Sequence, residues 1–474
     1  MNELTALSPI DGRYAKATKP LRQYLSEAGL IRARVRVECA YLLALADEPA
    51  LPFQLTDDER ALLQQSCDKV SEDDVVLVKR IETEGVPAAG GREAIPATRH
   101  DVKAVEYFIK KKLAGTSLEA KSEWVHFGLT SEDVNSVAYG LMLRDAFEHA
   151  MLPGLLPVYE KLKESAKTYA ALPMLARTHG QPASPTTFGK EMEVFVKRLE
   201  RQVDALKVSS ILVKFGGATG NWNAHQVAFP KADWPAFATR FVESLNAEGE
   251  GKKHFMRLEH NPFTTQIEPH DTYAELFDAY RRTNTILTDL AQDIWRYISD
   301  GWLVQEAKAG EIGSSAMPHK VNPIDFENAE GNFGIANALL EFFSRKLPVS
   351  RLQRDLSDST VERNFGVALA HTLVGYASLA KGLERVRPDE AAFGEALAAH
   401  PEVLAEAIQT ILRREGVEGA YEKLKDLMRG KKVSMMDIKV FIESLDVSED
   451  VRKELLALTP EGYTGLAEQL AKGK

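Results

Sequence analysis

Residues 310–332 contain more side chains suited to chemistry than any other stretch of this 474-residue chain. Two hydroxyls (Ser314 and Ser315), an imidazole (His319), an ammonium group (Lys320) and an amide (Asn322) follow one another closely. Glycines and prolines surround them, which makes a continuous helix unfavourable. None of these side chains serves a hydrophobic core, so the stretch is predicted to be a working loop. A plain surface connection is the alternative, because such loops also collect glycine and proline.

The residue types in this loop favour one chemistry over two others. The chain has no Gly-x-Ser-x-Gly sequence of the kind that a serine hydrolase places on a strand-turn-helix. Its eleven histidines show no spacing typical of a metal site. Removal of a proton beside a carboxylate fits better, because the charge that grows on the carboxylate oxygens needs N–H donors and a cation. The glycine-rich backbone would supply the donors, and Lys320 the cation.

Composition and charge limit the partners and the compartment. The formal net charge of −10 argues against a nucleic-acid partner, and an anionic substrate would need cations gathered locally. The two cysteines, Cys39 and Cys67, cannot build a disulfide framework, which favours a reducing cytoplasm. The amino terminus lacks the pattern of a signal peptide, and no stretch has the length of a membrane span. We therefore expect a soluble cytoplasmic protein with no membrane partner.

Apolar spacing predicts an all-α protein of three helical domains, at 1–119, 120–383 and 384–474. The central domain is expected to be a bundle of long helices, because apolar residues recur at steps of three and four. Their seams are Leu152, Leu155, Tyr159, Leu162, Ala166 and Tyr169; Phe188, Met192, Phe195, Leu199, Val203 and Leu206; and Leu276, Tyr280, Leu287, Leu290, Ile294 and Ile298. Faces of this length can exceed what one chain covers, so an oligomer with a multi-subunit helical core is expected.

Three interruptions of the bundle, at 124–133, 177–183 and 261–271, are predicted to be loops that carry chemistry. In the first, Ser131 with an acidic residue after it predicts a helix N-terminus, whose free N–H groups suit an anion. Before the bundle, Thr98 or Asp101 is predicted to cap a helix through Val105 and Phe108.

A basic segment follows the working loop at 344–363. Arg351, Arg354 and Arg363 are interleaved with Ser357 and Ser359, a combination suited to phosphate or carboxylate. A solvated helical face is the alternative interpretation.

The motifs of the chain resemble those of a known family. Gly313, Ser314, Ser315, Met317, Pro318, Lys320 and Asn322 match the signature G-S-S-x-M-P-x-K-x-N of the fumarase/aspartase superfamily. Further segments make the chain similar to the adenylosuccinate lyase family over nearly its whole length: Asp11–Tyr14, Thr98–Asp101, Thr130–Asp133, Arg177–Ala183, Thr265–His270 and the region from Arg354 through Arg363. Other branches share the Ser-Ser loop but, as a rule, not Thr-His-Gly-Gln-Pro-Ala.

The resemblance implies a C–N lyase without cofactor or metal that eliminates fumarate from adenylosuccinate and from the succinyl-carboxamide intermediate of purine synthesis. By position, Ser314 is the base that removes the Cβ proton and His179 the acid that protonates the leaving nitrogen. The residues implied to bind the nucleotide substrate are Arg13, Tyr14, Arg99, His100, Asp101, Thr130, Ser131, Gln266, Lys320, Asn322, Asn328, Arg354, Ser359 and Arg363.

The same resemblance implies a homotetramer whose sites each draw loops from three subunits. Residues 311–325 are expected to become ordered when nucleotide and fumarate bind. Argininosuccinate lyase or another fumarate-releasing lyase is the alternative among enzymes, and a catalytically inactive helical scaffold is the alternative outside them.

Overall fold

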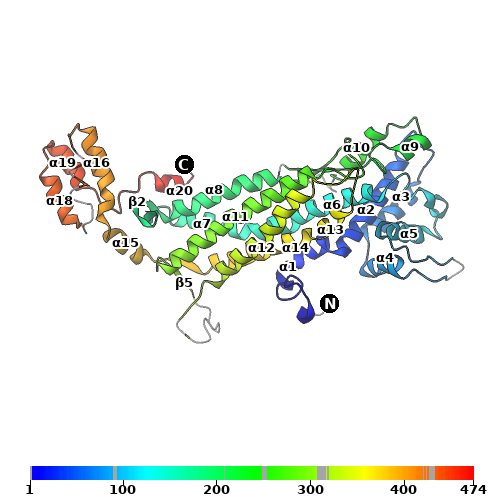
Figure 1. Ribbon diagram of the computed structural model, residues 1–474, viewed down its shortest axis with the longest axis horizontal. Helices are drawn as coiled ribbons and strands as arrows, with labels where there is room; N and C mark the ends of the chain where they lie inside the picture. The colour runs from blue at the N-terminus through cyan, green and yellow to red at the C-terminus, as the bar shows by residue number, and fades with distance from the viewer. Residues whose placement is uncertain are drawn as a thin grey trace. The chain divides into compact units, whose positions relative to one another are not determined.

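The computed structural model describes residues 3–473 except 89–92, 208, 248–253, 307–316, 318–319, 420, 423 and 426–432. Within these residues the chain is mostly helical, as predicted, with strands only in three two-stranded sheets (Figure 1). By its internal contacts the chain forms two compact units, and the boundaries between them fall in long helices or at their ends. Unit 1 contains residues 1–155, 202–285 and 331–375, and unit 2 contains 156–201, 286–330 and 376–474. The three-domain division at 119 and 383 stays a prediction.

The N-terminal part consists of helices of moderate length. They are η1 (Glu3–Thr5), α1 (Ala15–Leu25), α2 (Glu27–Ala46), α3 (Asp57–Asp68), α4 (Glu72–Thr83), α5 (Asp101–Leu113), η2 (Glu119–Trp124), α6 (Ser131–Ala146) and the π-helical turn η3 (Phe147–Met151). Helix α6 is the centre of unit 1, because all of it except Ser131 and Asp145 is buried. A helix buried on every side cannot show a one-sided apolar stripe.

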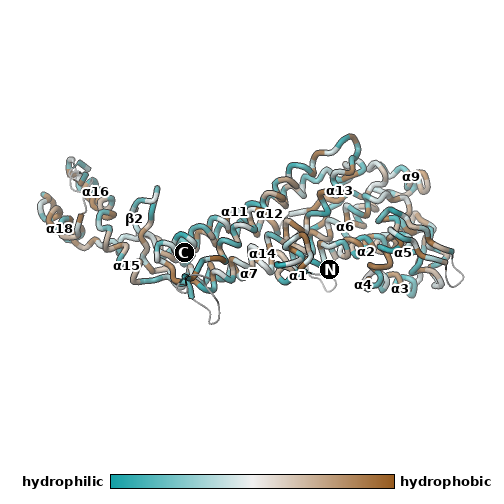
Figure 2. Tube along the Cα trace, turned by 60° about the horizontal axis from the view of Figure 1, so that its bottom comes forward, coloured by the Kyte–Doolittle hydropathy of each residue, from teal (hydrophilic) through white to brown (hydrophobic). Residues whose placement is uncertain are grey.

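Five long helices form the bundle: α7 (Leu152–Thr168), α8 (Phe188–Lys207), α11 (Asp271–Ser299), α12 (Ile324–Lys346) and α14 (Phe365–Leu383). The predicted seams face inward, since Leu162, Leu199 and Leu287 are fully buried. Polar and apolar residues alternate along α11 and α12 in Figure 2. Close approach is allowed by glycine: a Cβ on Gly382 of α14 would lie 2.9 Å from the ring of Phe326 on α12. The predicted helix-against-helix packing is therefore confirmed.

The remaining elements flank these helices. In unit 1 they are α9 (Asn223–Ala228), α10 (Trp234–Ser244), α13 (Ser357–Glu362) and the parallel strands β3 (Ser210–Val213) and β4 (Arg257–His260). In unit 2 they are the antiparallel pair β5 (Leu303–Gln305) and β6 (Val386–Pro388), then α15 (Glu390–Ala398), η5 (Pro401–Leu404), α16 (Ala405–Arg414), α18 (Met435–Glu443), α19 (Glu449–Leu456) and α20 (Ala467–Ala471). An apolar cluster that includes Leu412, Ile442 and Leu455 packs α16, α18 and α19 together.

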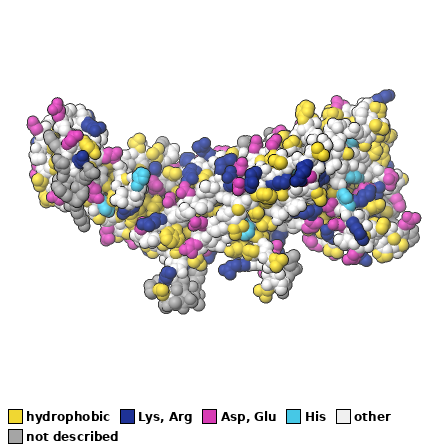
Figure 3. Space-filling view, viewed as in Figure 1, with side chains coloured by type: hydrophobic (Ala, Val, Ile, Leu, Met, Phe, Trp, Pro, Cys, Tyr) yellow, Lys and Arg dark blue, Asp and Glu magenta, His cyan; other side chains and the backbone are white. Residues whose placement is uncertain are grey.

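Charge is mixed on the molecular surface. On the face seen in Figure 3, Lys and Arg side chains lie among Asp and Glu side chains. Any binding of an anion must therefore depend on particular cations rather than on the net charge of −10. Among the described helices, none is both long and apolar enough to cross a membrane.

Candidate functional site

His179 occupies the tip of a β-hairpin in unit 2. Strands β1 (Pro173–Thr178) and β2 (Gln181–Thr187) pair antiparallel with Thr178 opposite Gln181, which leaves a two-residue turn. Both turn residues have positive φ, 53° for His179 and 73° for Gly180, as a type I′ turn requires. Histidine is a less usual choice there than asparagine, aspartate or glycine, and non-glycine residues in this conformation concentrate at functional sites.

The hairpin corrects the prediction of a loop at 177–183. Two prolines in β2, Pro182 and Pro185, obscured the strand in the sequence because proline lacks the N–H of a regular ladder. A two-stranded hairpin tolerates them, since each strand has an open edge. The imidazole of His179 is exposed at the tip.

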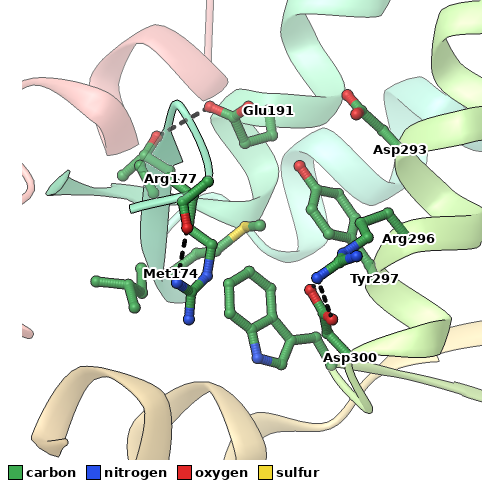
Figure 4. Close-up of a pocket in the computed structure, with 12 residues that line it drawn as sticks. Met174, Arg177, Glu191, Asp293, Arg296, Tyr297 and Asp300 are labelled. Atoms are coloured by element: carbon green, nitrogen blue, oxygen red, sulfur yellow. Dashed lines mark hydrogen bonds and ion pairs between the residues drawn. The ribbon is translucent and has the colours of Figure 1, made fainter. Parts of the chain in front are cut away.

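A cavity of about 650 Å³ lies beside this hairpin, within unit 2 (Figure 4). The guanidinium of Arg177 lies 5.7 Å from the ring centroid of Trp302, and its Nη1 donates to the carbonyl of Gly180 at 3.3 Å. Across the cavity, Arg296 and Asp300 are paired at 2.9 Å. Arg177 therefore stacks on an aromatic face and also braces the turn that carries His179.

The cavity is also lined by a carboxyl group with an altered proton affinity. Burial, together with the carboxylates of Asp289 and Glu191, raises the pKa of Asp293 to about 6. Asp293 therefore takes up a proton closer to neutral pH than an ordinary aspartate does.

The hairpin is held from its other side by the C-terminal part of unit 2. Glu406 of α16 accepts hydrogen bonds from Ser184 of β2 and from Tyr463, the latter at 3.0 Å. At the end of β2, a Cβ on Gly189 would lie 2.5 Å from the carbonyl oxygen of Ala166. The close approach of α8 to α7 thus fixes the position of the base of the hairpin.

In unit 1, the predicted residues around 98–101 and 130–131 meet. The side chain of His100, not Thr98 or Asp101, caps α5: its Nδ1 accepts the N–H of Lys103 at 3.3 Å. The same imidazole lies 3.4 Å from the Ser131 hydroxyl through Nε2. Histidine is outside the usual set of capping residues, so propensity did not identify it. Its neighbour Arg99 has a φ of 49°.

Two arginines converge on Asp101, which follows this cap. Arg34 and Arg363 each donate to Asp101 at 2.8 Å, and Arg363 also binds Glu27 at 2.9 Å. Burial alone would raise the pKa of Asp101, but Arg34, hydrogen bonds and Arg363 lower it to about 2. The structure thus places His100, Asp101, Ser131 and Arg363 in one cluster.

Helix α6 begins at Ser131, as predicted, and its first turn contains two buried acids. Asp133 accepts the N–H of Thr130 at 2.8 Å through one carboxylate oxygen. Its other oxygen accepts the N–H groups of Gly216 and Gly217 and lies 2.6 Å from the ammonium of Lys214. Both charged side chains are fully buried. This ion pair anchors the 214–217 segment to the start of α6.

The second acid, Glu132, lies 3.0 Å from Arg354. Arg354 also donates to Asp358 at 3.2 Å and is 16% exposed, so the alternative of a solvated face is wrong for it. Arg351, with 84% exposure and a partner in Asp355, fits that alternative. The basic segment therefore contains a half-buried arginine, Arg354, and a solvated one, Arg351.

The other predicted residues are distributed more widely. In unit 1, Arg13 is exposed, whereas Tyr14, Gln266 and Ser359 are half-buried, and Gln266 donates to the carbonyl of Ala218 at 3.2 Å. In unit 2, Asn328 donates to Ser378 at 2.6 Å, Asn322 is half-buried and Lys320 is exposed. Ser314, Ser315, Pro318 and His319, and most of 311–325, lie outside the described residues. The predicted site thus divides between the two units.

The sequence patterns did not identify Arg34 and Lys214 as parts of these clusters. They also did not identify Glu132 as the partner of Arg354. Their partners are distant in the chain: Arg34 donates to Asn135, 101 positions away, at 2.9 Å. Three arginines between 31 and 37 were the only local signal, and helical faces commonly carry such residues. In the part of the chain that the structure describes, no His, Cys, Asp and Glu side chains gather as a metal site requires.

Comparisons with known proteins show which family the chain belongs to. Residues 12–336 match the family described as Lyase, and residues 350–464 match the family described as Adenylosuccinate lyase C-terminal. Adenylosuccinate lyase of Dictyostelium discoideum is 46% identical over 98% of this chain and 97% of its own length. The proteins of that name from Haemophilus influenzae and Escherichia coli are each 45% identical, over 100% and 98% of this chain and 99% and 98% of their own lengths.

Solved structures share the fold at lower identity. The 3-carboxy-cis,cis-muconate lactonizing enzyme of Pseudomonas putida has a TM-score of 0.70 and 21% identity, over 96% of this chain and 95% of its own. A fumarate lyase from Mesorhizobium sp. BNC1 has a TM-score of 0.72 and 17% identity, over 96% and 97%. Fold and matches together define a lyase of the fumarase/aspartase superfamily. Within it, the chain belongs to the adenylosuccinate lyase family. The predicted class, a fumarate-releasing C–N lyase, is confirmed.

Proposed function

We propose that this chain eliminates fumarate from adenylosuccinate to leave AMP, and from the succinyl-carboxamide nucleotide to leave the corresponding carboxamide. The observation that carries the proposal is identity of 45–46% with adenylosuccinate lyases over at least 97% of both chains. Each elimination needs a base, which takes the proton that leaves carbon, and an acid, which gives the proton that joins the departing nitrogen. No bound metal or cofactor enters this proposal.

His179 is the acid in this proposal and Ser314 the base. The exposed tip of a braced turn suits an acid, because the imidazole can reach a substrate while the backbone stays fixed. A serine hydroxyl is a poor base near neutral pH, so it must be ionised by nearby cations in a pocket from which water is excluded. Lys320 is the proposed cation of the same segment.

The unit 1 cluster binds the anionic groups of the nucleotide in this proposal. Ser131 begins a helix of sixteen residues, and the N–H groups of its first turn make this helix end favourable for an anion. Arg363 is exposed and Arg354 retains donors beyond those directed at Glu132 and Asp358. His100 lies within reach of the Ser131 hydroxyl. These groups supply local cations and donors despite the negative net charge.

A direct assay separates this activity from the alternatives. Purified protein is given adenylosuccinate or argininosuccinate, and fumarate is measured. Fumarate from adenylosuccinate is expected. Fumarate only from argininosuccinate would establish the sibling lyase, and none from either would favour an inactive scaffold.

We also propose a homotetramer with sites shared between subunits. Large apolar side chains are exposed on the long helices, as a partner helix would require: Trp295, Ile324, Ile335 and Phe342. If sites are shared, the inactive variants His179→Ala and Ser314→Ala rescue each other after joint dissociation and reassembly. Random mixing should leave roughly a quarter of the sites with both residues intact. Mixing without dissociation is the control, and hybrids verified by native mass spectrometry that stay inactive would refute shared sites.

A further inference from the structure

Glu132 is a fully buried carboxyl group that contacts a predicted ligand-binding residue without being one itself. Its Oε2 lies 3.0 Å from Nη2 of Arg354 and accepts a hydrogen bond from Asn135 at 3.2 Å. Its Oε1 has no hydrogen-bond partner among the residues that the structure describes. The contact with Arg354 joins positions 132 and 354 and so connects the start of α6 to the segment that leads into α13.

Arg354 is held from two sides. Glu132 approaches it from α6, and Asp358 of α13 accepts its Nε–H at 3.2 Å. The arginine is 16% exposed, whereas Glu132 is 0% and Asp358 3% exposed. The partly exposed guanidinium is therefore held by two buried carboxyl groups, those of Glu132 and Asp358. These two groups set the direction of its remaining N–H groups.

The buried carboxyl groups around Arg354 are not a favourable source of folding stability. Three carboxyl groups, Glu132, Asp358 and Glu362, are buried near the guanidinium of Arg354. Burial, with Glu132 and Asp358, raises the pKa of Glu362 well above its usual range. Burial also raises the pKa of Glu132 against the opposing effect of Arg354. Well-packed apolar side chains are often at least as stable as such an arrangement.

We propose that Glu132 is a positioning residue, which fixes Arg354 relative to the Thr130–Ser131 turn so that both contact the same oxyanion of the substrate. Glu132 follows Ser131 directly, so one short element determines where the turn and the arginine lie. The inference rests on the proposed function, because Arg354 must contact the nucleotide. The oxyanion is a phosphate or a carboxylate, and the two products distinguish these: AMP carries only the phosphate and fumarate only carboxylates.

A double-mutant cycle tests the inference on the full-length enzyme. Wild type, Glu132→Gln, Arg354→Gln and the double variant are compared for kcat and KM with adenylosuccinate, for the Kd of AMP and for inhibition by fumarate. Each single change is expected to raise KM about 10-fold, the lower end for hydrogen bonds to charged groups, with kcat altered much less. In the Arg354→Gln background, Glu132→Gln should add less than about 2-fold, because coupled residues are not additive.

The product arms identify the oxyanion. A rise in the Kd of AMP with unchanged fumarate inhibition assigns the phosphate, and the reverse assigns a carboxylate. Glu38→Gln is the matched control, since Glu38 is a fully buried carboxyl paired with His126 at 2.5 Å. Its KM should equal that of wild type. If Glu132→Gln is insoluble, Glu132→Asp keeps the charge but shortens its reach, and should give a smaller rise in KM that disappears with Arg354→Gln.

Several results would overturn the inference. An equal rise in KM with and without Arg354, or an unchanged or lowered KM in Glu132→Gln, would show that Glu132 does not act through the arginine. If Arg354→Gln leaves KM and the Kd of AMP unchanged, the proposed role of Arg354 fails as well. If Arg354→Gln raises KM but the effects of the two changes on KM add in the double variant, only the positioning role of Glu132 is refuted.

Discussion

The turn at His179 and Gly180 permits a test that separates chemistry from folding. His179 has a φ of 53°, a left-handed conformation that asparagine adopts more readily than most residues. His179→Asn therefore removes the proposed acid and keeps the turn. We expect the free energy of unfolding to change by less than about 0.5 kcal/mol, since the exposed imidazole packs against no core.

Turnover should respond very differently. Loss of a general acid lowers kcat by ~10²–10⁴, which corresponds to about 2.7–5.4 kcal/mol of transition-state stabilisation. His179→Gly, which relieves the left-handed strain of roughly 1 kcal/mol, should be equally inactive. Any loss of activity in both variants then cannot be attributed to the turn.

The assay combines initial rates of fumarate release with chemical denaturation of the same preparations. His149→Asn, at an exposed histidine in unit 1, is the matched control and should retain normal turnover. Normal turnover in His179→Asn, with its mass verified, would remove His179 from the mechanism. A large loss of stability in that variant would instead contradict the turn geometry.

Two further predictions concern stability in unit 1. The pKa of Asp101 is about 2 in the fold, below the value of about 3.9 for a free aspartate, so its carboxylate stabilises the protein above pH 4 and loses this contribution as pH falls toward 2. Asp101→Asn should cost about 2–3 kcal/mol at pH 7 and about half of that at pH 3, measured by urea unfolding, and an equal cost at both pH values would contradict the shift. Lys214→Met leaves Asp133 buried without its cation and should cost about 3–5 kcal/mol, whereas a cost below about 1 kcal/mol would show that the pair is not buried in solution.

Local patterns predicted the parts of the molecule that depend on local structure. The seams of the long helices repeat at helical spacing, and Ser131 with the acids after it starts α6 as expected. The hairpin at His179 was hidden because its strand contains prolines and because two-stranded sheets need no long alternating run. The sequence did not reveal that His100 caps α5, because an imidazole can accept the helix N–H only in a suitable ring orientation.

The partners inside the site could not be predicted from local patterns. Arg354 meets Glu132, and Arg363 meets Asp101 and Glu27, across more than 200 positions of the chain. Nothing near Arg354 in the sequence distinguishes it from Arg351, yet Arg354 is half-buried and Arg351 is solvated. Which arginine is anchored is decided by tertiary packing around α6.

The turn at His179 also bears on how inactive forms of this enzyme can arise. Histidine and asparagine codons differ only in their first base, so one base change converts His179 to a residue that readily adopts this left-handed backbone. With the proposed acid role, such a chain would fold normally and reach normal abundance, because cellular abundance follows stability. Genetic screens that score protein levels would pass this variant as intact, and only screens that score growth or product formation would detect it.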